Sequence, residues 1–588
     1  MIGAGFPLVA VPLAWYVLGV AGAALHPLRV SPLTVFAVIR GAAVLVVVTW
    51  VVTRWLALPG SVALVVVLIA VLIALAARAR YGTLRAVVVP ARRDLPMLAL
   101  ATALLTVWIA PVTRHGIGAI GTGNHADLPS YLLQAGYLFN HGFDATAVLP
   151  GIYPEARMFD GFGASALLAP STAISTAPSI GVMAMMILGS VLVAQLVDRL
   201  SSRALGGARV APLLIGATLL MSGTFTFNAF AYFLAQVWGL AFGLGLVAVL
   251  LTGERGVPAA VNAAVVSVAG ILTYNPTGVM YAAVALVLGG WLIAMGLARR
   301  RPVLRSPELG VVAGVVLGGL LFISVWHLTV DRLWTLRDTV AGWPMPTSPL
   351  WAAVGIPISE RGNSTLAIVA GSCAVALVAG AGWLSIARGR EVLIRFWPLA
   401  IPCAVWVYRA WQEPGSYQQG KAFAYAQPLL IVGVACGAIL LAQRLTTGLH
   451  VLRTTRVRGA LAGTVAAGLL VCAVGYAFWP RSFFRDGGCC IATGDQIAQI
   501  QSGADRSPGR VHVSAGGVWA NDVAVAITSL TRPVSVDQPS IWPSLVVEPF
   551  GGTVTFETGT HPSLVEGRFV YQPTAAASPA LASRAAAP

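Results

Sequence analysis

The chain has 588 residues, of which 57% are hydrophobic and only 10% charged, and its mean hydropathy is +0.82. A soluble domain carries about 25% charged residues, so this composition excludes an ordinary soluble protein and indicates a polytopic membrane protein. The formal charge of +16 does not indicate nucleic-acid binding, because most arginines lie in short loops between apolar runs. Such loops are typical of an anionic cytoplasmic surface.

Fourteen apolar runs are long enough to cross a bilayer, which takes roughly 17–25 residues. In chain order they cover residues 3–24, 33–53, 61–77, 95–113, 179–198, 209–226, 231–251, 257–273, 277–297, 308–328, 365–387, 396–411, 426–443 and 459–479. They predict an all-α polytopic membrane domain of about 14 transmembrane helices over residues 1–479. The segment 162–177 is broken by Pro170, and we interpret it as a re-entrant or interfacial helix.

The basic residues predict the orientation of these spans. If the loop 78–94 is cytoplasmic, 21 arginines lie in inner loops and eight basic residues lie in outer loops before residue 480. The large outer loops are then 114–178, 329–364 and 412–425, and both termini are outside. The inner loops contain no glycine-rich nucleotide motif, so we expect any chemistry on the extracytoplasmic face of a plasma membrane.

The tail from residue 480 has a different pattern. The segments 510-RVHVSAGG, 533-PVSVDQ, 553-TVTFE and 568-RFVYQ alternate polar and apolar residues, and a helix-like stretch, VWANDVAVAITSL, follows the first of them. This pattern predicts a small extracytoplasmic α/β domain over 480–575, followed by a disordered tail over 576–588. Cys489 and Cys490 are adjacent there and form either a vicinal disulfide or none, and no cysteine spacing resembles a metal site.

The first outer loop carries the best candidate for a general base. Asp127 is followed by Pro129 and by the apolar run YLLQAGYLF, which predicts a short amphipathic helix on the membrane with Asp127 at its N-terminal end. A carboxylate there can deprotonate a sugar hydroxyl, or it can simply cap the helix. Further polar residues of this loop are candidates for lining the site or holding a hydroxyl or metal: His115, His125, His141, Asp144, Glu155 and Asp160. The histidine spacing matches no metal motif, and Asp144 lies in a turn-rich segment where Asp often bonds to the backbone.

Two later outer loops can bind a sugar phosphate. In the second loop, Trp334 can stack on a sugar and Arg337 can bind phosphate, although an interfacial belt of tryptophan and arginine explains them equally well. In the third loop, Lys421 is the only lysine among 37 basic residues. Its ammonium can either donate to a phosphate or snorkel to lipid headgroups. Its polar neighbours in the sequence are Arg409, Glu413, Tyr417, Gln418, Gln419 and Tyr425.

Two short elements resemble motifs of the GT-C superfamily of membrane glycosyltransferases. The stretch 127-DLPSY-131 places an acid four residues before Tyr131, and 421-KAFAYAQPL-429 places lysine before Tyr425 and a proline. Lipid-A aminoarabinose and protein-mannosyl transferases carry similar elements in the first large outer loop and ahead of a late helix. Here Leu128 replaces the second acid often found beside the first, and three extra helices precede the loop. In layout the chain is similar to actinobacterial cell-wall arabinosyl- or mannosyltransferases.

The resemblance implies transfer of an arabinofuranose- or mannose-class sugar from a polyprenyl-phosphate donor to a cell-envelope glycan or glycolipid, with inversion. Asp127 would be the base, and Lys421, Arg409 and His125 would bind the donor phosphate. Such a donor is already activated, so the reaction requires no cofactor; a divalent cation is allowed but is not indicated. The alternatives are a transporter or flippase of a lipid-linked sugar, and a non-catalytic scaffold. Transporters often show internal repeats and ionisable residues at the bilayer midplane, and the sequence shows few of either.

Overall fold

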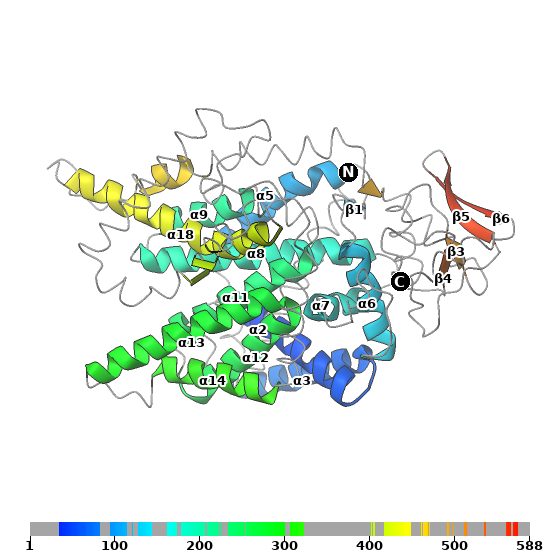
Figure 1. Ribbon diagram of the computed structural model, residues 1–588, viewed down its shortest axis with the longest axis horizontal. Coiled ribbons are helices and arrows are strands. Elements are labelled where there is room, and N and C mark those ends of the chain that lie inside the picture. The colour runs from blue at the N-terminus through cyan, green and yellow to red at the C-terminus, as the bar shows by residue number, and fades with distance from the viewer. Residues whose placement is uncertain are drawn as a thin grey trace.

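The computed structural model describes most of the first 322 residues, one later long helix and parts of the C-terminal region (Figure 1). The described residues are 34–82, 95–113, 120–121, 127–143, 162–172, 178–205, 209–222, 225, 233–252, 255–299, 306–322, 401–402, 404–405, 408, 417–447, 460, 462–468, 470, 491–492, 498, 502, 511–513, 534–536, 560–565 and 568–573. Over these residues the chain is mostly helical, with a few short strands.

The helices occupy positions where apolar runs predict them. In chain order they are α2 (Thr34–Trp50), the π-helix η2 (Val51–Trp55), α3 (Gly60–Arg80), α5 (Leu95–Thr113), α6 (Asp127–His141), α7 (Phe162–Thr172), α8 (Pro178–Ala204), α9 (Val210–Met221), α11 (Leu234–Thr252), α12 (Val257–Thr273), α13 (Asn275–Ala298), α14 (Pro307–Leu321) and α18 (Tyr417–Thr447). Within the described ranges, four segments are long and apolar enough to cross a membrane: Val35–Trp55, Gly60–Arg80, Ala184–Ala204 and Asn275–Ala298. By length and composition these are membrane-spanning helices.

Helix α18 differs from the prediction at its start. It begins at Tyr417, whereas the apolar run predicts a start near residue 426, so residues 417–425 of the predicted outer loop are helical. Hydropathy assigns the polar residues of this stretch to a loop, but a helix can hold them where neighbouring helices supply polar partners. The predicted spans 3–24 and 365–387 lie outside the described residues, as do most residues of 396–411 and 459–479. The total of about 14 spans therefore stays a prediction.

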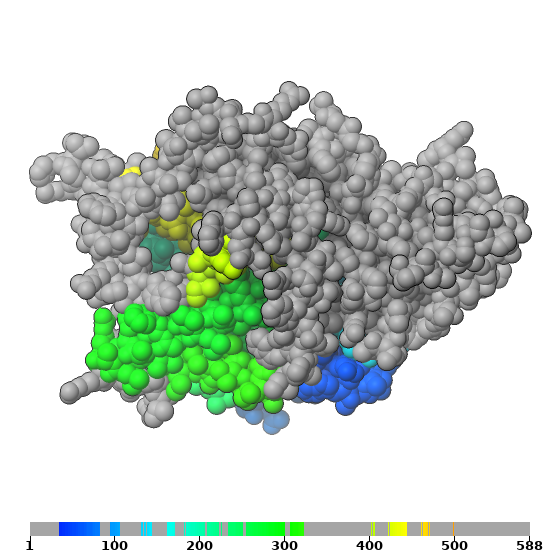
Figure 2. Space-filling model, viewed as in Figure 1, coloured from blue at the N-terminus to red at the C-terminus, as the bar shows by residue number. Residues whose placement is uncertain are grey.

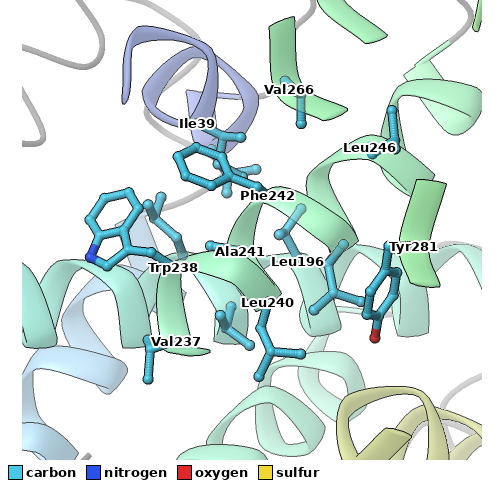
Figure 3. Close-up of a cluster of buried hydrophobic side chains, with 14 of the residues drawn as sticks. Ile39, Leu196, Val237, Trp238, Leu240, Ala241, Phe242, Leu246, Val266 and Tyr281 are labelled. Carbon is cyan, nitrogen blue, oxygen red and sulfur yellow. The ribbon is translucent and has the colours of Figure 1, made fainter. Parts of the chain in front are cut away.

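Helix α11 lies at the centre of the bundle, where it packs against α2, α8, α12 and α13 (Figures 1 and 3). Every described side chain from residue 233 to 250 is buried, as expected for a helix that is apolar on all sides. Its glycines allow close approach of the neighbours: a Cβ at Gly243 would lie 2.6 Å from the ring of Tyr281, and one at Gly245 would lie 3.0 Å from Ile39. Small residues serve this purpose in membrane bundles.

Helices α12 and α13 join through a single extended residue. Tyr274 has φ −153° and ψ 98°, and Pro276 lies in the first turn of α13, where its missing N–H costs nothing. The chain therefore reverses within one residue, and the two helices touch immediately. A Cβ at Gly278 would collide with the backbone of Gly270 and Ile271. Glycine is required here by the close approach of the two helices.

Helices α6 and α7 form a packed pair beside α3. The side chain of Ser165 donates to Oε1 of Gln134 at 2.9 Å, and this bond links the two helices inside the core. Gly142 ends α6 with φ +88°, a left-handed conformation at the position after a helix where glycine is preferred. The turn brings Phe143 against Trp50, with ring centroids 5.2 Å apart.

The segment 162–177 forms a short buried helix in its described part. Helix α7 has 11 residues, and Pro170 lies inside it. Its rise is about 16 Å, whereas the hydrocarbon core of a bilayer is about 30 Å thick, so α7 is too short to span. Residues 162–169 are buried against α2, α6, α8 and α12. The location fits a re-entrant helix better than an interfacial one.

Several helices expose an apolar face outward. The uncovered faces of α13 and α14 are visible in Figure 2 together with part of α3. On α3 and α14 the exposed side chains are Val65, Val66, Leu68, Ile69, Leu72, Ile73, Val316, Leu317, Leu320 and Leu321. In a soluble protein such a surface would aggregate, but in a bilayer it faces lipid tails.

Short strands lie beyond α6 and α7, at the right in Figure 1, whereas α13 and α18 run to the left. β3 (Val511–Val513) pairs in parallel with β4 (Val534–Val536), and β5 (Thr560–Val565) pairs antiparallel with β6 (Arg568–Pro573). Three of these strands lie where sequence alternation predicts them; the predicted strand at 553-TVTFE is outside the described residues. Closer to the bundle, β1 (Ile120–Gly121) pairs antiparallel with β2 (Ile491–Ala492).

The α12–α13 turn generates a prediction. Gly278→Ala adds a methyl group that must displace backbone, so we expect it to destabilise the fold by about 1–3 kcal/mol. Gly290→Ala on the same helix is the control, because no atom lies within 4 Å of its Cβ position. Thermal unfolding of the purified protein in detergent measures the difference. Equal melting temperatures for the two variants would contradict the packing described for the turn.

Candidate functional site

Lys421 lies in the first turns of α18 and is buried inside the helical bundle. Its side chain is 7% exposed, and Nζ donates a hydrogen bond to Oε1 of Gln236 at 2.8 Å. The ammonium also lies over the ring of Phe233, 3.7 Å from the centroid, and 5.8 Å from the ring centroid of Tyr274. This geometry does not fit a lysine that snorkels to lipid headgroups, because a snorkelling ammonium lies in the wet interface.

Two tyrosines adjoin the lysine. The hydroxyl of Tyr425 donates to the hydroxyl of Tyr274 at 2.8 Å, and the two rings meet edge to face at 5.7 Å. One helical turn separates Lys421 from Tyr425, so both side chains lie on the same face of α18. The phenol groups therefore border the same region as the ammonium.

A third tyrosine stabilises the backbone of α18 at this point. The hydroxyl of Tyr281 donates to the backbone carbonyl of Tyr425 at 2.9 Å, and Figure 3 shows the hydroxyl directed away from the apolar cluster around α11. Pro428 lies three residues later inside the helix, where a proline removes a backbone donor. Neighbouring side chains commonly satisfy the carbonyls near a proline in membrane helices. The bond fixes the turn that carries Tyr425.

These residues come together because several helix ends meet there. Gln236 is in the first turn of α11, Tyr274 joins α12 to α13, and Lys421 is in the first turns of α18. Gln427, two residues after Tyr425, donates to Oγ of Ser222 just after α9 at 2.9 Å, which is a further contact of α18 with another helix. All of these ends lie on the side that the arginine distribution predicts to be extracytoplasmic.

The site consists of a cation, ring faces and neutral polar groups. Burial strengthens the electrostatic attraction of the ammonium for an anion, since the effective dielectric constant inside a protein is low. Among the described residues, the buried Nε2 of Gln236 has no hydrogen-bond partner, and neither has Oγ1 of Thr277, one turn after Tyr274. A buried unsatisfied group costs about 1–3 kcal/mol. The arrangement is suited to an incoming group that is anionic and rich in acceptors.

The structure places Asp127 at the start of a helix, as predicted. Helix α6 begins at Asp127, although its side chain is not among those described. Tyr131, one turn later, is half-buried and packs against the core. On the neighbouring helix α7, a Cβ at Gly163 would collide with Thr273, the residue before Tyr274. Helix α7 therefore packs beside the turn that carries Tyr274, and α6 packs on α7.

The remaining candidates have no described side chains. Tyr417 and Gln418 are in the first turn of α18 and His141 is the last residue of α6, but only their backbone is described. Residues His125, Asp144, Trp334, Arg337 and Arg409 lie outside the described residues, as do Cys489 and Cys490. Within the described part of the chain, no three His, Cys, Asp or Glu residues come together in a way that could hold a metal ion.

Sequence reasoning missed the partners of Lys421. Gln236 and Phe233 lie within or beside the predicted span 231–251, and Tyr274 lies between two predicted spans. One signal was available: a polar amide inside an apolar run is costly in a membrane and commonly marks a functional position. The tyrosines carried no such signal, because tyrosine is common at membrane interfaces.

No family model matches the sequence, and no curated protein shows significant similarity to it. Among solved structures, similar ones include the oligosaccharyltransferase of Archaeoglobus fulgidus in the apo form. Another is the archaeal oligosaccharyltransferase AglB of that organism in complex with an inhibitory peptide and a dolichol-phosphate. Each superposes with a TM-score of 0.43 at 11% identity and covers 74% of this chain and 64% of the other. The chain thus spans less than two thirds of the length of these structures, and the likeness assigns no residue and no activity.

Proposed function

We propose that the protein is a membrane glycosyltransferase that transfers a sugar from a polyprenyl-phosphate donor on the extracytoplasmic face of the plasma membrane. The observation that carries the proposal is the buried ammonium of Lys421 among Gln236, Phe233 and Tyr274. A lipid-linked phosphate is an anion available to a protein in a membrane, and its hydrophobic tail suits exposed apolar helix faces such as those of α13 and α14. A compact ammonium binds phosphate as a point charge.

In the proposed reaction, Asp127 takes the proton of the acceptor hydroxyl as that oxygen attacks the anomeric carbon of the donor. The bond between the anomeric carbon and the phosphate oxygen breaks, and the bonding electrons leave with the polyprenyl phosphate. The configuration inverts because there is one displacement. Lys421 stabilises the charge that develops on the leaving phosphate, and the hydroxyls of Tyr274 and Tyr425 border it. Arg409 and His125 are further candidates for this role.

The proposed acceptor is a cell-envelope glycan or glycolipid, and the proposed sugar is of the arabinofuranose or mannose class. Tyr131, His141, Asp144, Trp334, Arg337, Tyr417 and Gln418 are proposed to line the sugar and acceptor sites. The pairing of β1 with β2 supports a role for the C-terminal region near the acceptor, because it brings Ile491 beside the loop that precedes Asp127.

One observation favours a second candidate function. An ionisable residue buried between membrane helices also marks substrate paths in transporters, and Lys421 is such a residue. A flippase of the same lipid-linked sugar would bind the same phosphate but would form no glycosidic bond. The two functions differ in detergent, where only a transferase still converts donor and acceptor to product.

The first functional prediction concerns Asp127. The purified protein in detergent, given polyprenyl-phosphate sugars and envelope glycan acceptors, should form product. Asp127→Asn should lower the rate by about 100-fold or more, because general base catalysis contributes about 10²–10⁴-fold. Donor binding should remain near the wild-type level. An active Asp127→Asn variant would remove this residue from the base role, and donor flipping without product would favour the transporter.

The second functional prediction concerns the shape of the cation. Lys421→Arg keeps the charge but replaces a compact ammonium with a wide planar group, in a space bounded by Gln236 and the ring of Phe233. We expect at least about a tenfold loss of transfer rate with a melting temperature close to wild type. Arg54→Lys, at an exposed position at the end of η2, is the control for exchange of the two cations. Full activity of Lys421→Arg would exclude a close contact between the lysine and the phosphate.

A further inference from the structure

Gln236 uses only one of its two polar atoms. The side chain is 1% exposed, and its Oε1 accepts the hydrogen bond from Lys421. Its Nε2 carries two N–H donors and has no hydrogen-bond partner among the described residues. Buried amide groups are normally satisfied at both ends. Within the described part of the chain, the site therefore contains an unused donor.

The ammonium fixes which way the amide points. Lysine carries three donors and no acceptor, so only the carbonyl oxygen of Gln236 can face Nζ. An exposed amide can exchange its oxygen and nitrogen by rotation, but this one would then place donor against donor. The –NH₂ group is consequently held on the side of the amide that turns away from the bond with Lys421.

A second unsatisfied group lies on the same helix contact. Thr277 is fully buried, and no residue in the described ranges forms a hydrogen bond with its Oγ1. It lies one turn after Tyr274, and its Cβ is 3.7 Å from the Cβ position of Gly239, one turn after Gln236. Two polar atoms without a hydrogen-bond partner among the described residues thus lie on facing turns of α11 and α13. A bound polar group could supply the hydrogen bonds that they lack.

We propose that Gln236 is a second phosphate-binding residue, whose amide N–H donates to the lipid-borne phosphate that the ammonium of Lys421 also binds. The inference rests on the proposed function and adds to it a neutral donor beside the charged one. A phosphate oxygen accepts several hydrogen bonds at once, so one group can satisfy both residues. The amide is pre-oriented by Lys421, and binding does not require it to reorganise.

The test measures binding of a short-chain polyprenyl phosphate to the full-length protein in detergent, with the matching polyprenol as the uncharged probe. Gln236→Met, Lys421→Met and the double variant are compared with wild type. Methionine keeps the length of the glutamine side chain, is one atom shorter than lysine, and removes the donor at either position. The control is Gln427→Met, since Gln427 is equally buried at 1% exposure but its Nε2 is satisfied by Ser222.

We expect wild type to prefer the phosphate over the polyprenol by about tenfold or more, since hydrogen bonds to charged groups contribute about that much. Each single variant should lose about tenfold in affinity for the phosphate and nothing for the polyprenol. Gln236→Met should weaken binding further in the Lys421→Met background. Gln427→Met should bind as wild type does.

Each contrary result has a distinct meaning. If Gln236→Met has an effect only while Lys421 is present, or if Lys421→Met alone abolishes the preference for phosphate, Gln236 is not an independent donor and this inference fails. The proposed function would survive either result. If wild type shows no preference for the phosphate, both fail. A Gln236 effect seen with the sugar-bearing donor but absent with the sugar-free phosphate would assign the amide to a sugar hydroxyl and overturn the inference.

A competition experiment distinguishes a polyprenyl phosphate from a membrane phospholipid as the source of the bound phosphate. Phosphatidylglycerol carries a lipid phosphate without a polyprenyl chain, and it is titrated against bound polyprenyl phosphate. Failure to compete supports a donor site. Equal competition would assign the two donors to a membrane phospholipid and overturn the assignment to the polyprenyl carrier.

Discussion

A charge taken out of water must be given acceptors inside the protein, and this constraint shapes the end of the bundle where α11 and α18 begin. The ammonium of Lys421 receives the oxygen of Gln236 and the ring face of Phe233. An isolated buried charge would otherwise shift toward its neutral form or leave the interior. To keep the contact, the starts of α11 and α18 must stay together, and Tyr274 must hold the turn beside them. The site and the helix packing are thus one arrangement.

The centre of the bundle provides the rigidity for this arrangement. Helix α11 is buried on every side. If it rotated about its axis, its side chains would no longer fit the close-packed side chains of the neighbouring helices. Trp238 adds a directed bond, because its Nε1 donates to the carbonyl of Met185 on α8 at 3.0 Å. Gln236 lies one half-turn before this anchor. Its amide therefore projects from a helix whose orientation is already set.

Sequence reasoning located helices well and contacts poorly. The apolar run 257–273 coincides with α12, because a long, mostly apolar run in a bilayer leaves few other conformations. The start of α18 was predicted too late, since Lys421 and Tyr425 are buried against partners elsewhere in the chain that hydropathy does not reveal. Lys421 was singled out by its rarity, but Gln236 lies 185 residues away, and no local pattern connects them. Contacts at such separations depend on packing that a single sequence does not encode locally.

The two-residue pairing of β1 with β2 sets a limit on distance. Gly121 is held beside Ile491, and only residues 122–126 separate it from Asp127 at the start of α6. An extended chain advances about 3.5 Å per residue, so the six steps from Gly121 to Asp127 reach at most about 20 Å. The chain that follows Ile491 consequently begins within roughly this distance of Asp127, the candidate base. The pairing thus limits how far the start of the C-terminal region can lie from the first turn of α6.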